Sequence, residues 1–397
     1  MDKLTYLLLA FLCATVFIGC AAVTFSETGD TAEVKETTQK EKSTVTAETT
    51  EKAETTANTE AATTASNVSD SNDAGERVDG VKTIALSDNN ISYSGSGIIA
   101  LKNTVVINEG GSYALSGTLS DGKIIVDTAD EVRLILSGVN ITSSKSSAIE
   151  FIGTGGAVIE IAENTINRLS DEKLKKKDVD NEDAVIYSNS DITVTGGGRL
   201  DITGNRRGAL YARNKLAVYD GIINIEKSYE GMESDGELII NGGNIHIISS
   251  DDALNAADNI VINGGYIYAE SKGDGFDSNG DMSINGGEIY IFAANKKNSP
   301  LDVSDGDKIG NFYINGGTVV AGGGDNRLDV DSLSRQGFAW VYPTRTLNKK
   351  ESVKVSIISE DGSEIIAFTA PKEFELLFIS TDKLELGDNM LDLRIIA

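Results

Sequence analysis

The stretch Gly242–Asn263, GGNIHIISSDDALNAADNIVIN, is followed at once by Gly264–Asn285, GGYIYAESKGDGFDSNGDMSIN. The two segments share a glycine pair at the start, alternating apolar residues and a final Asn. Equivalent glycines recur along a longer part of the chain, at Gly198, Gly221, Gly243, Gly265, Gly287 and Gly317. Self-similarity at a short, nearly constant period indicates a repeat architecture in which each repeat stacks on its neighbours.

Each repeat predicts three short strands. Ile245 and Ile247 alternate with polar residues after the glycine pair, and Ile260 and Ile262 have the same spacing of two before the next pair. Leu254 lies between them in a third short segment. A period of two is the side-chain period of a β-strand. Three strands in roughly 22 residues predict one coil of a parallel β-helix, with about 4.8 Å between stacked coils.

The corner before each glycine pair carries an Asn, at Asn241, Asn263, Asn285 and Asn315. We expect these residues to tolerate a left-handed backbone and their amide side chains to bond from coil to coil. The glycines should supply positive φ angles without a Cβ clash. Both residue types are therefore interpreted as structural.

The repeat ends near residue 327, and we assign residues 79–327 to the β-helix. Residues 328–397 contain alternating strands around an Asp-Gly turn, which predicts a small antiparallel β region. We expect it to cap the end of the β-helix or pack on its side, because an open end would expose unpaired strand edges. Trp340 lies outside the repeats and is expected in the core.

The first 78 residues differ from the rest in composition. Residues 1–20 contain the apolar run Leu4–Ile18, which fits the hydrophobic part of an export signal. Cys20 stands where a bacterial lipobox places its lipidated Cys, so we predict a lipoprotein held at the outer surface of the cell membrane. The alternative is an ordinary signal peptide that ends in Cys. Residues 21–78, rich in Thr, Glu and Ala, predict a disordered stalk.

Composition excludes several classes of protein. The chain of 397 residues has 35 basic and 61 acidic residues, a net charge of −26, with 1 His and 2 Cys. Nucleic-acid binding is not expected of so acidic a chain, because phosphate contacts need clustered Lys and Arg. A single His disfavours Ser-His-Asp and Cys-His catalysis and multi-His metal sites. Two Cys cannot form a disulfide-rich scaffold.

Acidic residues recur at the repeat period. Glu230, Asp252 and Asp274 should stack on one another, and a second series follows them three residues later in the sequence. Stacked carboxylates repel, but clusters of oxygen ligands suit Ca²⁺, and the lack of His and Cys disfavours softer metals. We predict bound calcium; the alternative is an unoccupied, solvated acidic ladder. The candidate ligands are Glu230, Glu233, Asp235, Asp251, Asp252, Asn255, Asp274, Asp277, Asp302 and Asp305.

The run at residues 183–243, together with DDALNA at 251–256 and GDGFDSNG at 273–280, resembles a clostridial-type family of exported carbohydrate-binding proteins. The resemblance covers residues 81–397. It implies a right-handed parallel β-helix, similar in fold to polysaccharide lyases, with calcium along the helix. It also implies that the turns containing Glu230, Asp252 and Asp274 are associated with calcium.

One outward column of aromatic residues offers a candidate sugar platform. His246, Tyr268 and Tyr290 occupy equivalent repeat positions, and Tyr266 is a neighbour. Such a column suits an extended polysaccharide; the alternative is packing between coils or against the C-terminal strands. We therefore expect a non-catalytic, cell-surface carbohydrate-binding protein. Its ligand would be either acidic and pectin-like, reached through calcium, or neutral and cellulose-like, bound by the Tyr column.

The sequence favours a non-catalytic protein and leaves an enzyme as the alternative. A calcium-dependent polysaccharide lyase needs a base near the uronate, often a Lys or Arg with a lowered pKa. Lys272, beside Asp274, is a weak candidate for that base, since neutralising the acidic column explains it equally well. A purely structural surface protein is the third alternative.

Overall fold

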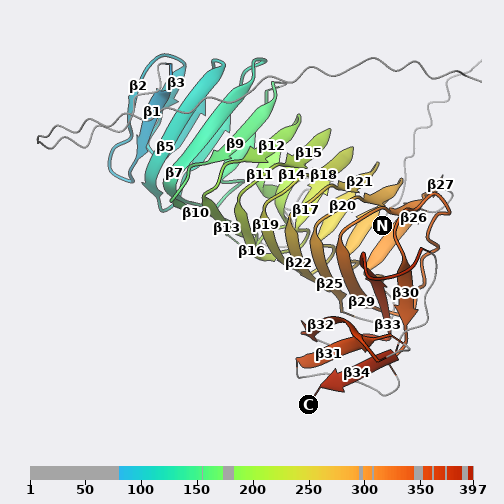
Figure 1. The fold of residues 1–397 in the computed structure, drawn as a ribbon. Coiled ribbons are helices and arrows are strands. Elements are labelled where there is room, and N and C mark those ends of the chain that lie inside the picture. The colour runs from blue at the N-terminus through green and yellow to red at the C-terminus, as the bar shows by residue number, and fades with distance from the viewer. Residues whose placement is uncertain are drawn as a thin grey trace, which may run out of the picture. The chain divides into compact units, whose positions relative to one another are not determined.

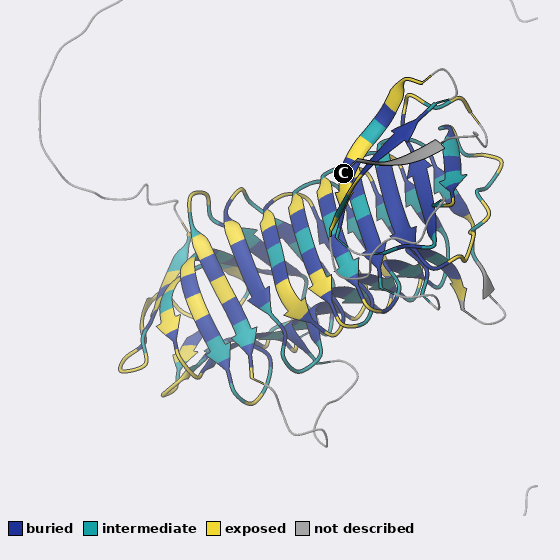
Figure 2. Cartoon of the chain, turned by 90° about the horizontal axis from the view of Figure 1, so that it is seen from below, coloured by how far each residue is buried: buried dark blue, intermediate teal, exposed yellow. Residues whose placement is uncertain are grey.

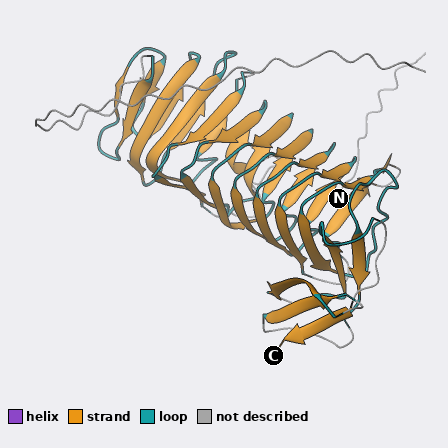
Figure 3. Cartoon of the chain, in the orientation of Figure 1, coloured by secondary structure: helices purple, strands orange, loops and turns teal. Residues whose placement is uncertain are grey.

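The computed structural model describes residues 80–397 except 154, 173–182, 295–297, 306–307, 344–351, 360–361, 372, 387–391 and 397. The predicted signal peptide, Cys20 and the predicted stalk lie outside the described residues. The described residues form strands and loops without any helix (Figure 3). Accordingly, none of them belongs to a helix that is long and apolar enough to cross a membrane.

The repeat region is a parallel β-helix with three sheets, as predicted (Figure 1). Sheet I stacks β9 (Ala157–Ile161), β12 (Ile192–Thr195), β15 (Lys215–Val218), β18 (Glu237–Ile240), β21 (Ile260–Ile262), β24 (Met282–Ile284) and β28 (Phe312–Ile314). Sheet II stacks β10 (Ile166–Asp171), β13 (Arg199–Thr203), β16 (Ile222–Ser228), β19 (Asn244–Ser249), β22 (Tyr266–Ser271), β25 (Glu288–Ala293) and β29 (Thr318–Gly323).

Sheet III completes each coil. It stacks β4 (Thr104–Ile107), β6 (Lys123–Val126), β8 (Ile149–Phe151), β11 (Ala184–Ser188), β14 (Gly208–Ala212), β17 (Met232–Ser234), β20 (Leu254–Ala256), β23 (Phe276–Ser278) and β26 (Leu301–Asp305). The chain therefore runs from sheet III to sheet I to sheet II and back in every coil. At the N-terminal end, the long strands β5 (Gly111–Leu119) and β7 (Val132–Ser143) each span sheets I and II.

The interior is filled by the apolar side chains of the three sheets. Ile245, Ile247, Leu254, Ile260 and Ile262 are all fully buried, as their alternation predicts. Buried and exposed residues alternate along the strands in Figure 2. The side chains between these buried positions point outward. On each sheet, outward residues that are in register on successive strands form a column along the axis of the β-helix.

The corner between sheets I and II is built from the Asn and Gly residues of the repeat. The Asn side chains form a ladder in which each Nδ2 donates to the Oδ1 of the previous coil at 2.8 Å, through Asn241, Asn263, Asn285 and Asn315. This bonding was predicted and is confirmed. The expected left-handed backbone at Asn is wrong: the positive φ lies on the second glycine, for example 95° at Gly265.

Antiparallel strands follow the last coil, as predicted. β33 (Leu376–Ser380) pairs with β29, and β30 (Phe338–Val341) pairs with β33, so the edge of sheet II is covered. β31 (Val353–Ile358), β32 (Glu364–Ala370) and β34 (Asp392–Ile396) form a separate three-stranded sheet. Trp340 packs against the main core, with its ring 4.9 Å from that of Phe378.

At the other end, β1 (Lys82–Leu86) pairs with β5 and with the antiparallel β2 (Ser92–Ser94), and β3 (Ile98–Ala100) pairs antiparallel with β4. β27 (Lys308–Ile309) pairs antiparallel with β26. Both ends of the β-helix thus carry antiparallel strands, which limits the exposure of unpaired backbone.

Candidate functional site

Sheet II presents one outward column that joins a polar end to an aromatic end. In register, this column contains Arg168, Asp201, Asn224, His246, Tyr268, Tyr290 and Val320. Successive members are one coil apart, about 4.8 Å. The column thus runs along the axis of the β-helix, across its strands.

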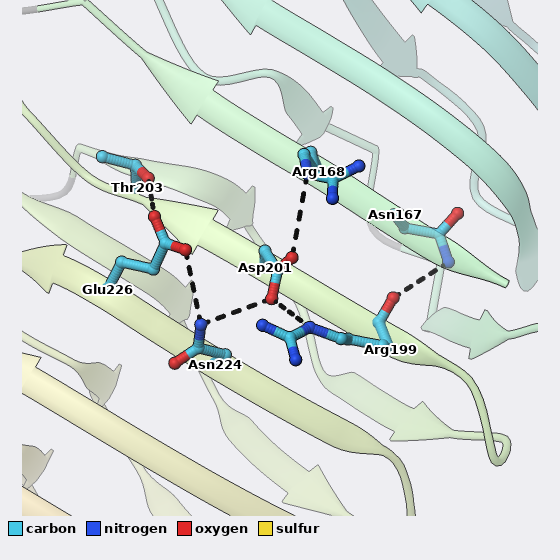
Figure 4. A network of polar contacts seen from close by, with 7 residues as sticks. All are labelled: Asn167, Arg168, Arg199, Asp201, Thr203, Asn224 and Glu226. Carbon is cyan, nitrogen blue, oxygen red and sulfur yellow. Dashed lines mark hydrogen bonds and ion pairs between the residues drawn. The ribbon is translucent and has the colours of Figure 1, made fainter.

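The polar end is organised around Asp201, which is only 8% exposed although it points outward (Figure 4). Arg199 Nε lies 2.7 Å from Asp201 Oδ1, and Arg168 Nε lies 3.8 Å from Oδ2. Asn224 Nδ2 donates to the same Oδ1 at 3.3 Å. One carboxylate therefore orients two guanidinium groups and one amide from three adjacent coils.

The network continues on both sides of Asp201. Asn224 Nδ2 also lies 3.5 Å from Glu226 Oε1, and Thr203 Oγ1 donates to Glu226 Oε2 at 3.4 Å. Asn167 Nδ2 donates to the backbone carbonyl of Arg199 at 3.2 Å, which ties β13 to β10 (Figure 4). These side-chain bonds between coils reinforce the backbone ladder at this end of sheet II.

The aromatic end begins at His246, which stacks on Tyr268 with ring centroids 5.0 Å apart and planes 5° from parallel. Tyr266, in the neighbouring column, is 37% exposed, and its ring lies 6.0 Å from that of Tyr290. Burial lowers the pKa of His246, an effect that the nearby Glu270 opposes. The imidazole is thus held in the stack with a bias toward its neutral form.

The C-terminal strands cover part of the aromatic column. Tyr268 and Tyr290 are half-buried and pack against an apolar cluster that includes Phe292 and Phe368, whose rings are 6.2 Å apart. Their hydroxyl groups are engaged by Glu270 at 2.8 Å and by Glu288 at 2.9 Å, respectively. The packing alternative therefore applies to Tyr268 and Tyr290, whereas Tyr266 is open to solvent, and the sugar platform stays a prediction.

The acidic residues at the corner from sheet II to sheet III stack as their spacing predicts, and each bonds to the next coil. Glu230 Oε2 accepts the backbone N–H of Asp252 at 3.0 Å. Asp252 Oδ1 accepts the N–H of Asp274 at 2.6 Å, and Asp274 Oδ1 accepts the N–H of Ser299. These carboxylates thus satisfy backbone donors that the turns would otherwise leave unpaired. Sequence reasoning missed this structural role.

The described residues that shape the same corner compensate its negative charge only in part. Burial, together with repulsion from Asp252 and Asp251, raises the pKa of Glu230 to about 9. Burial likewise raises the pKa of Asp274 to about 7, with further repulsion from Asp252. Arg207 partly offsets this, since its Nη2 lies 3.4 Å from Glu233 Oε1. The corner is therefore an environment that would favour either protons or a cation.

The second acidic series forms an outward column on sheet III. Glu233, Asn255, Asp277 and Asp302 are in register on successive coils, which confirms the predicted stacking. Asp235 accepts a hydrogen bond from the Tyr211 hydroxyl at 2.6 Å. Within the part of the chain that the structure describes, no three acidic, His or Cys side chains converge as a metal site.

The remaining candidates take other positions. Asp251 accepts a hydrogen bond from Tyr229, which raises the pKa of that phenol to about 12. The backbone of Asp305 pairs with Lys308, and its side chain is outside what the structure describes. Lys272 is exposed on the turn after β22. Of the predicted site residues, the aromatic set and the stacked acidic set are each brought together, on different sides of the coil.

Comparison with known proteins places the chain in a family. A family model described as carbohydrate-binding domain-containing protein matches residues 101–335. The chain belongs to this family. A carbohydrate-binding domain-containing protein of Acetivibrio thermocellus is 35% identical over 135 residues, which cover 33% of this chain and 47% of that protein. The chain thus spans about half the length of this curated relative.

A solved structure also matches part of the chain. It is the polysaccharide lyase-like protein from C. thermocellum, determined as a gadolinium derivative, with 30% sequence identity and a TM-score of 0.49. The match covers 52% of this chain and 89% of that chain. The matched family region, residues 101–335, contains both the sheet II column and the acidic corner.

Sequence reasoning missed the polar end of the sheet II column, namely Arg168, Arg199, Asp201 and Asn224. A signal for two of them was present, because Gly198, Gly221 and Gly243 mark the same corner of three coils. Asp201, Asn224 and His246 each follow their glycine by three residues and so had to share one column. Arg168 lies in a coil without that glycine signature, and only the structure shows its register.

Proposed function

We propose that the outward face of sheet II binds polysaccharide without catalysing its cleavage. The proposal rests on one observation: the column Asp201–Asn224–His246–Tyr268 places hydrogen-bonding groups and a stacked aromatic pair in line along the axis. Sugar rings offer an apolar face and a rim of hydroxyl groups. A flat sheet face with both kinds of contact in one line is complementary to an extended chain of such rings.

Two features favour binding at this face over the other outward ladders. Tyr266 presents an exposed ring beside the column, and the exposed isoleucines Ile222 and Ile248 lie on the adjacent strands β16 and β19. Exposed apolar side chains clustered on one sheet face mark an interaction surface. The sheet III column is acidic at Glu233, Asp277 and Asp302. It also contains a stacked pair, Tyr187 and Tyr211, but the Tyr211 ring is buried.

The proposed binding track, which is the outward face of sheet II along the axis, ends at the C-terminal strands. Because Tyr290 packs against the cluster that contains Phe368, a polysaccharide that lies along the axis meets these strands after passing Tyr266. We propose that the binding track extends from Arg168 to Tyr266, about five coils, or roughly 20 Å at the spacing of parallel strands. Such a length accommodates a short run of sugar units.

We further propose that calcium binds at the acidic corner and that the protein is exported and anchored through Cys20. The donor set supports calcium because it consists of carboxylate and amide oxygens, which are the ligands this ion prefers. Asp252, Asp274, Asp277 and Asp302 would hold the ion, and its charge would oppose the burial and the repulsion that together raise the pKa of Asp274. When bound, calcium would join adjacent coils.

The experiment that tests carbohydrate binding compares Tyr266→Ala with Tyr313→Ala by affinity electrophoresis in gels that contain soluble polysaccharides. Tyr313 is an outward Tyr on sheet I and serves as the matched control. We expect Tyr266→Ala to weaken binding about fivefold, because loss of an aromatic contact costs roughly 1 kcal/mol, and the control to bind as wild type. Equal retardation of wild type and both variants would refute the site.

Catalysis is tested separately on the same protein. A lyase would release unsaturated uronide from pectate, which absorbs in the ultraviolet, with calcium present. We expect no increase in absorbance. A steady increase that is lost in Lys272→Ala would replace the binding proposal by the lyase alternative.

A further inference from the structure

The polar end of the sheet II column carries two guanidinium groups whose terminal nitrogens remain available. Both ion pairs to Asp201 use the Nε atoms of Arg168 and Arg199. The Nη atoms of these two residues have no hydrogen-bond or ion-pair partner among the described residues. The side chains are 59% and 44% exposed, whereas that of Asp201 is 10% exposed. Asp201 therefore holds the Nε edge of Arg199 by a hydrogen bond and lies within ion-pair range of Arg168 Nε, while both arginine side chains are exposed (Figure 4).

From this geometry we infer that Arg168 and Arg199 form a subsite for an oxyanion carried by the polysaccharide, with Asp201 as their positioning residue. The inference rests on the proposed function, since it assigns a ligand chemistry to one end of the same track. The oxyanion is a carboxylate of a uronic acid or a sulfate ester. Planar guanidinium groups suit both, because they bind oxyanions through parallel N–H donors.

The local charge at this end of the face is balanced, although the chain as a whole is acidic. The guanidinium groups of Arg168 and Arg199 lie beside the carboxylates of Asp201 and Glu226. Of the two carboxylates, Glu226 lies beyond Asn224 and is engaged by Asn224 and Thr203. At physiological salt, charges more than about 8 Å apart are largely screened, so the nearest groups dominate.

Apolar neighbours strengthen this subsite. In the column next to Asp201, Arg199 lies between Ile166 and Ile222, which are 49% and 43% exposed. A sugar ring that covers these isoleucines would exclude water from the guanidinium group. Charge-assisted hydrogen bonds gain strength when water is excluded from them. The subsite would therefore recognise the anionic group together with the ring that carries it.

The distance to the aromatic pair sets the direction of the ligand. His246 is two coils beyond Asp201, about 10 Å along the axis. An oxyanion at the arginines and a ring at the His246–Tyr268 pair would thus belong to different sugar units of one chain. The polysaccharide would lie across the strands, parallel to the axis.

The test uses the full chain in EDTA, so that calcium cannot bridge the ligand to the acidic corner. Binding is measured for polygalacturonate and its methyl ester, for dextran sulfate and dextran, and for a neutral cellulose-derived glucan. The variants are Arg199→Gln, Arg168→Gln and the double variant. Arg133→Gln is the matched control, because Arg133 is an outward, partly exposed residue on β7, paired with Glu160 at 2.7 Å.

We expect wild type to prefer polygalacturonate over its methyl ester, or dextran sulfate over dextran, and the favoured pair identifies the oxyanion. Loss of a charge-assisted contact should raise Kd about tenfold in Arg199→Gln and flatten its dependence on salt. Arg133→Gln should bind as wild type. Asp201→Asn should raise Kd for the anionic ligand by a larger factor than Kd for the neutral glucan, a difference that a merely structural role of Asp201 would not produce.

Two outcomes overturn the inference in distinguishable ways. If wild type binds the neutral glucan but neither anionic ligand, or if the double variant keeps full anion binding, the subsite is wrong and the proposed function stands. If wild type binds none of the polysaccharides, the proposed function fails and the inference fails with it. Unchanged thermal unfolding of the variants confirms that any loss reflects the site.

Discussion

Asp171 allows the most direct test of how a buried carboxyl group affects the stability of this β-helix. It ends β10 and is 1% exposed, and its Oδ1 accepts the backbone N–H groups of Asn205 and Arg206. Its Oδ2 is buried without a hydrogen-bond partner among the described residues. Burial raises the pKa of Asp171 from 3.8 to about 6, although the two N–H groups and the Arg206 charge oppose the shift.

The sign of the effect on stability follows from this direction. The folded state binds the Asp171 proton more tightly than the unfolded state does. The protonated carboxyl group therefore makes its full contribution to the free energy of unfolding below about pH 4. This contribution is lost as the pH rises through 6. The shift from 3.8 to about 6 corresponds to about 3 kcal/mol, since one pKa unit is about 1.4 kcal/mol.

The perturbation is Asp171→Asn, which keeps an acceptor oxygen for Asn205 and Arg206 but cannot ionise. We expect the unfolding midpoint of the variant, relative to wild type, to rise between pH 4 and 6.5 and to level off above. The assay is thermal unfolding followed by circular dichroism in EDTA. Asp325→Asn, at an exposed position, controls for the removal of one charge. Midpoints are compared directly because a repeat array need not unfold in one step.

A flat difference between Asp171→Asn and wild type over this pH range would refute the reasoning. It would mean that Arg206 compensates the buried carboxylate fully. A variant that loses stability most at high pH would reverse the sign and show that the ion pair outweighs burial.

The remaining predictions concern the corner glycines and calcium. Gly265→Ala should lower the unfolding midpoint, because its φ is 95° and a Cβ would lie 2.9 Å from the Gly243 carbonyl oxygen; the cost is about 1–3 kcal/mol. Gly156→Ala, whose Cβ would find no atom closer than 3.8 Å, is the control and should unfold close to wild type. Calcium at about 100 times its Kd should stabilise the fold by roughly 2.7 kcal/mol relative to EDTA, and Asp277→Asn combined with Asp302→Asn should shrink this gain whereas Asp329→Asn should not. Equal melting temperatures in calcium and EDTA would remove the calcium proposal.

Much of the fold could be predicted because the sequence pattern of one coil recurs many times along the chain. Gly243, Gly265 and Gly287 fix the register of successive coils, and the alternation around Ile245 and Ile267 then decides which side chains fill the interior. Parallel stacking makes every such inference transfer from one coil to the next. The error about the Asn backbone arose because a corner of Asn-Gly-Gly has only one residue that must be left-handed, and the second glycine takes it.

The candidate site was harder to predict because its partners come from coils of different length. Asp201 is 33 residues after Arg168 and 23 before Asn224, so only the stacked structure shows that they meet. The contact between the aromatic column and the C-terminal strands could not be predicted either. Phe368 lies outside the repeat, and no sequence spacing relates it to Phe292. Sequence periodicity specifies which residues share a column; it does not specify what lies on top of that column.

The distribution of acidic residues explains how a chain of net charge −26 can still carry the proposed oxyanion subsite. Along the corner from sheet II to sheet III, carboxylates such as Asp252 bond to the backbone of the next coil, so their number reflects the count of coils. Outward residues of sheet II are free of that structural demand. There, Asp201 and Glu226 lie beside Arg168 and Arg199, so the charges at this end of the face balance although the chain as a whole is acidic. Since exposed charges more than about 8 Å apart are largely screened, a ligand at this face is governed by the arginines and not by the corner. Net charge therefore gives an expectation against nucleic acid, which needs a broad basic surface, but not against the proposed polysaccharide, which presents one oxyanion at a time.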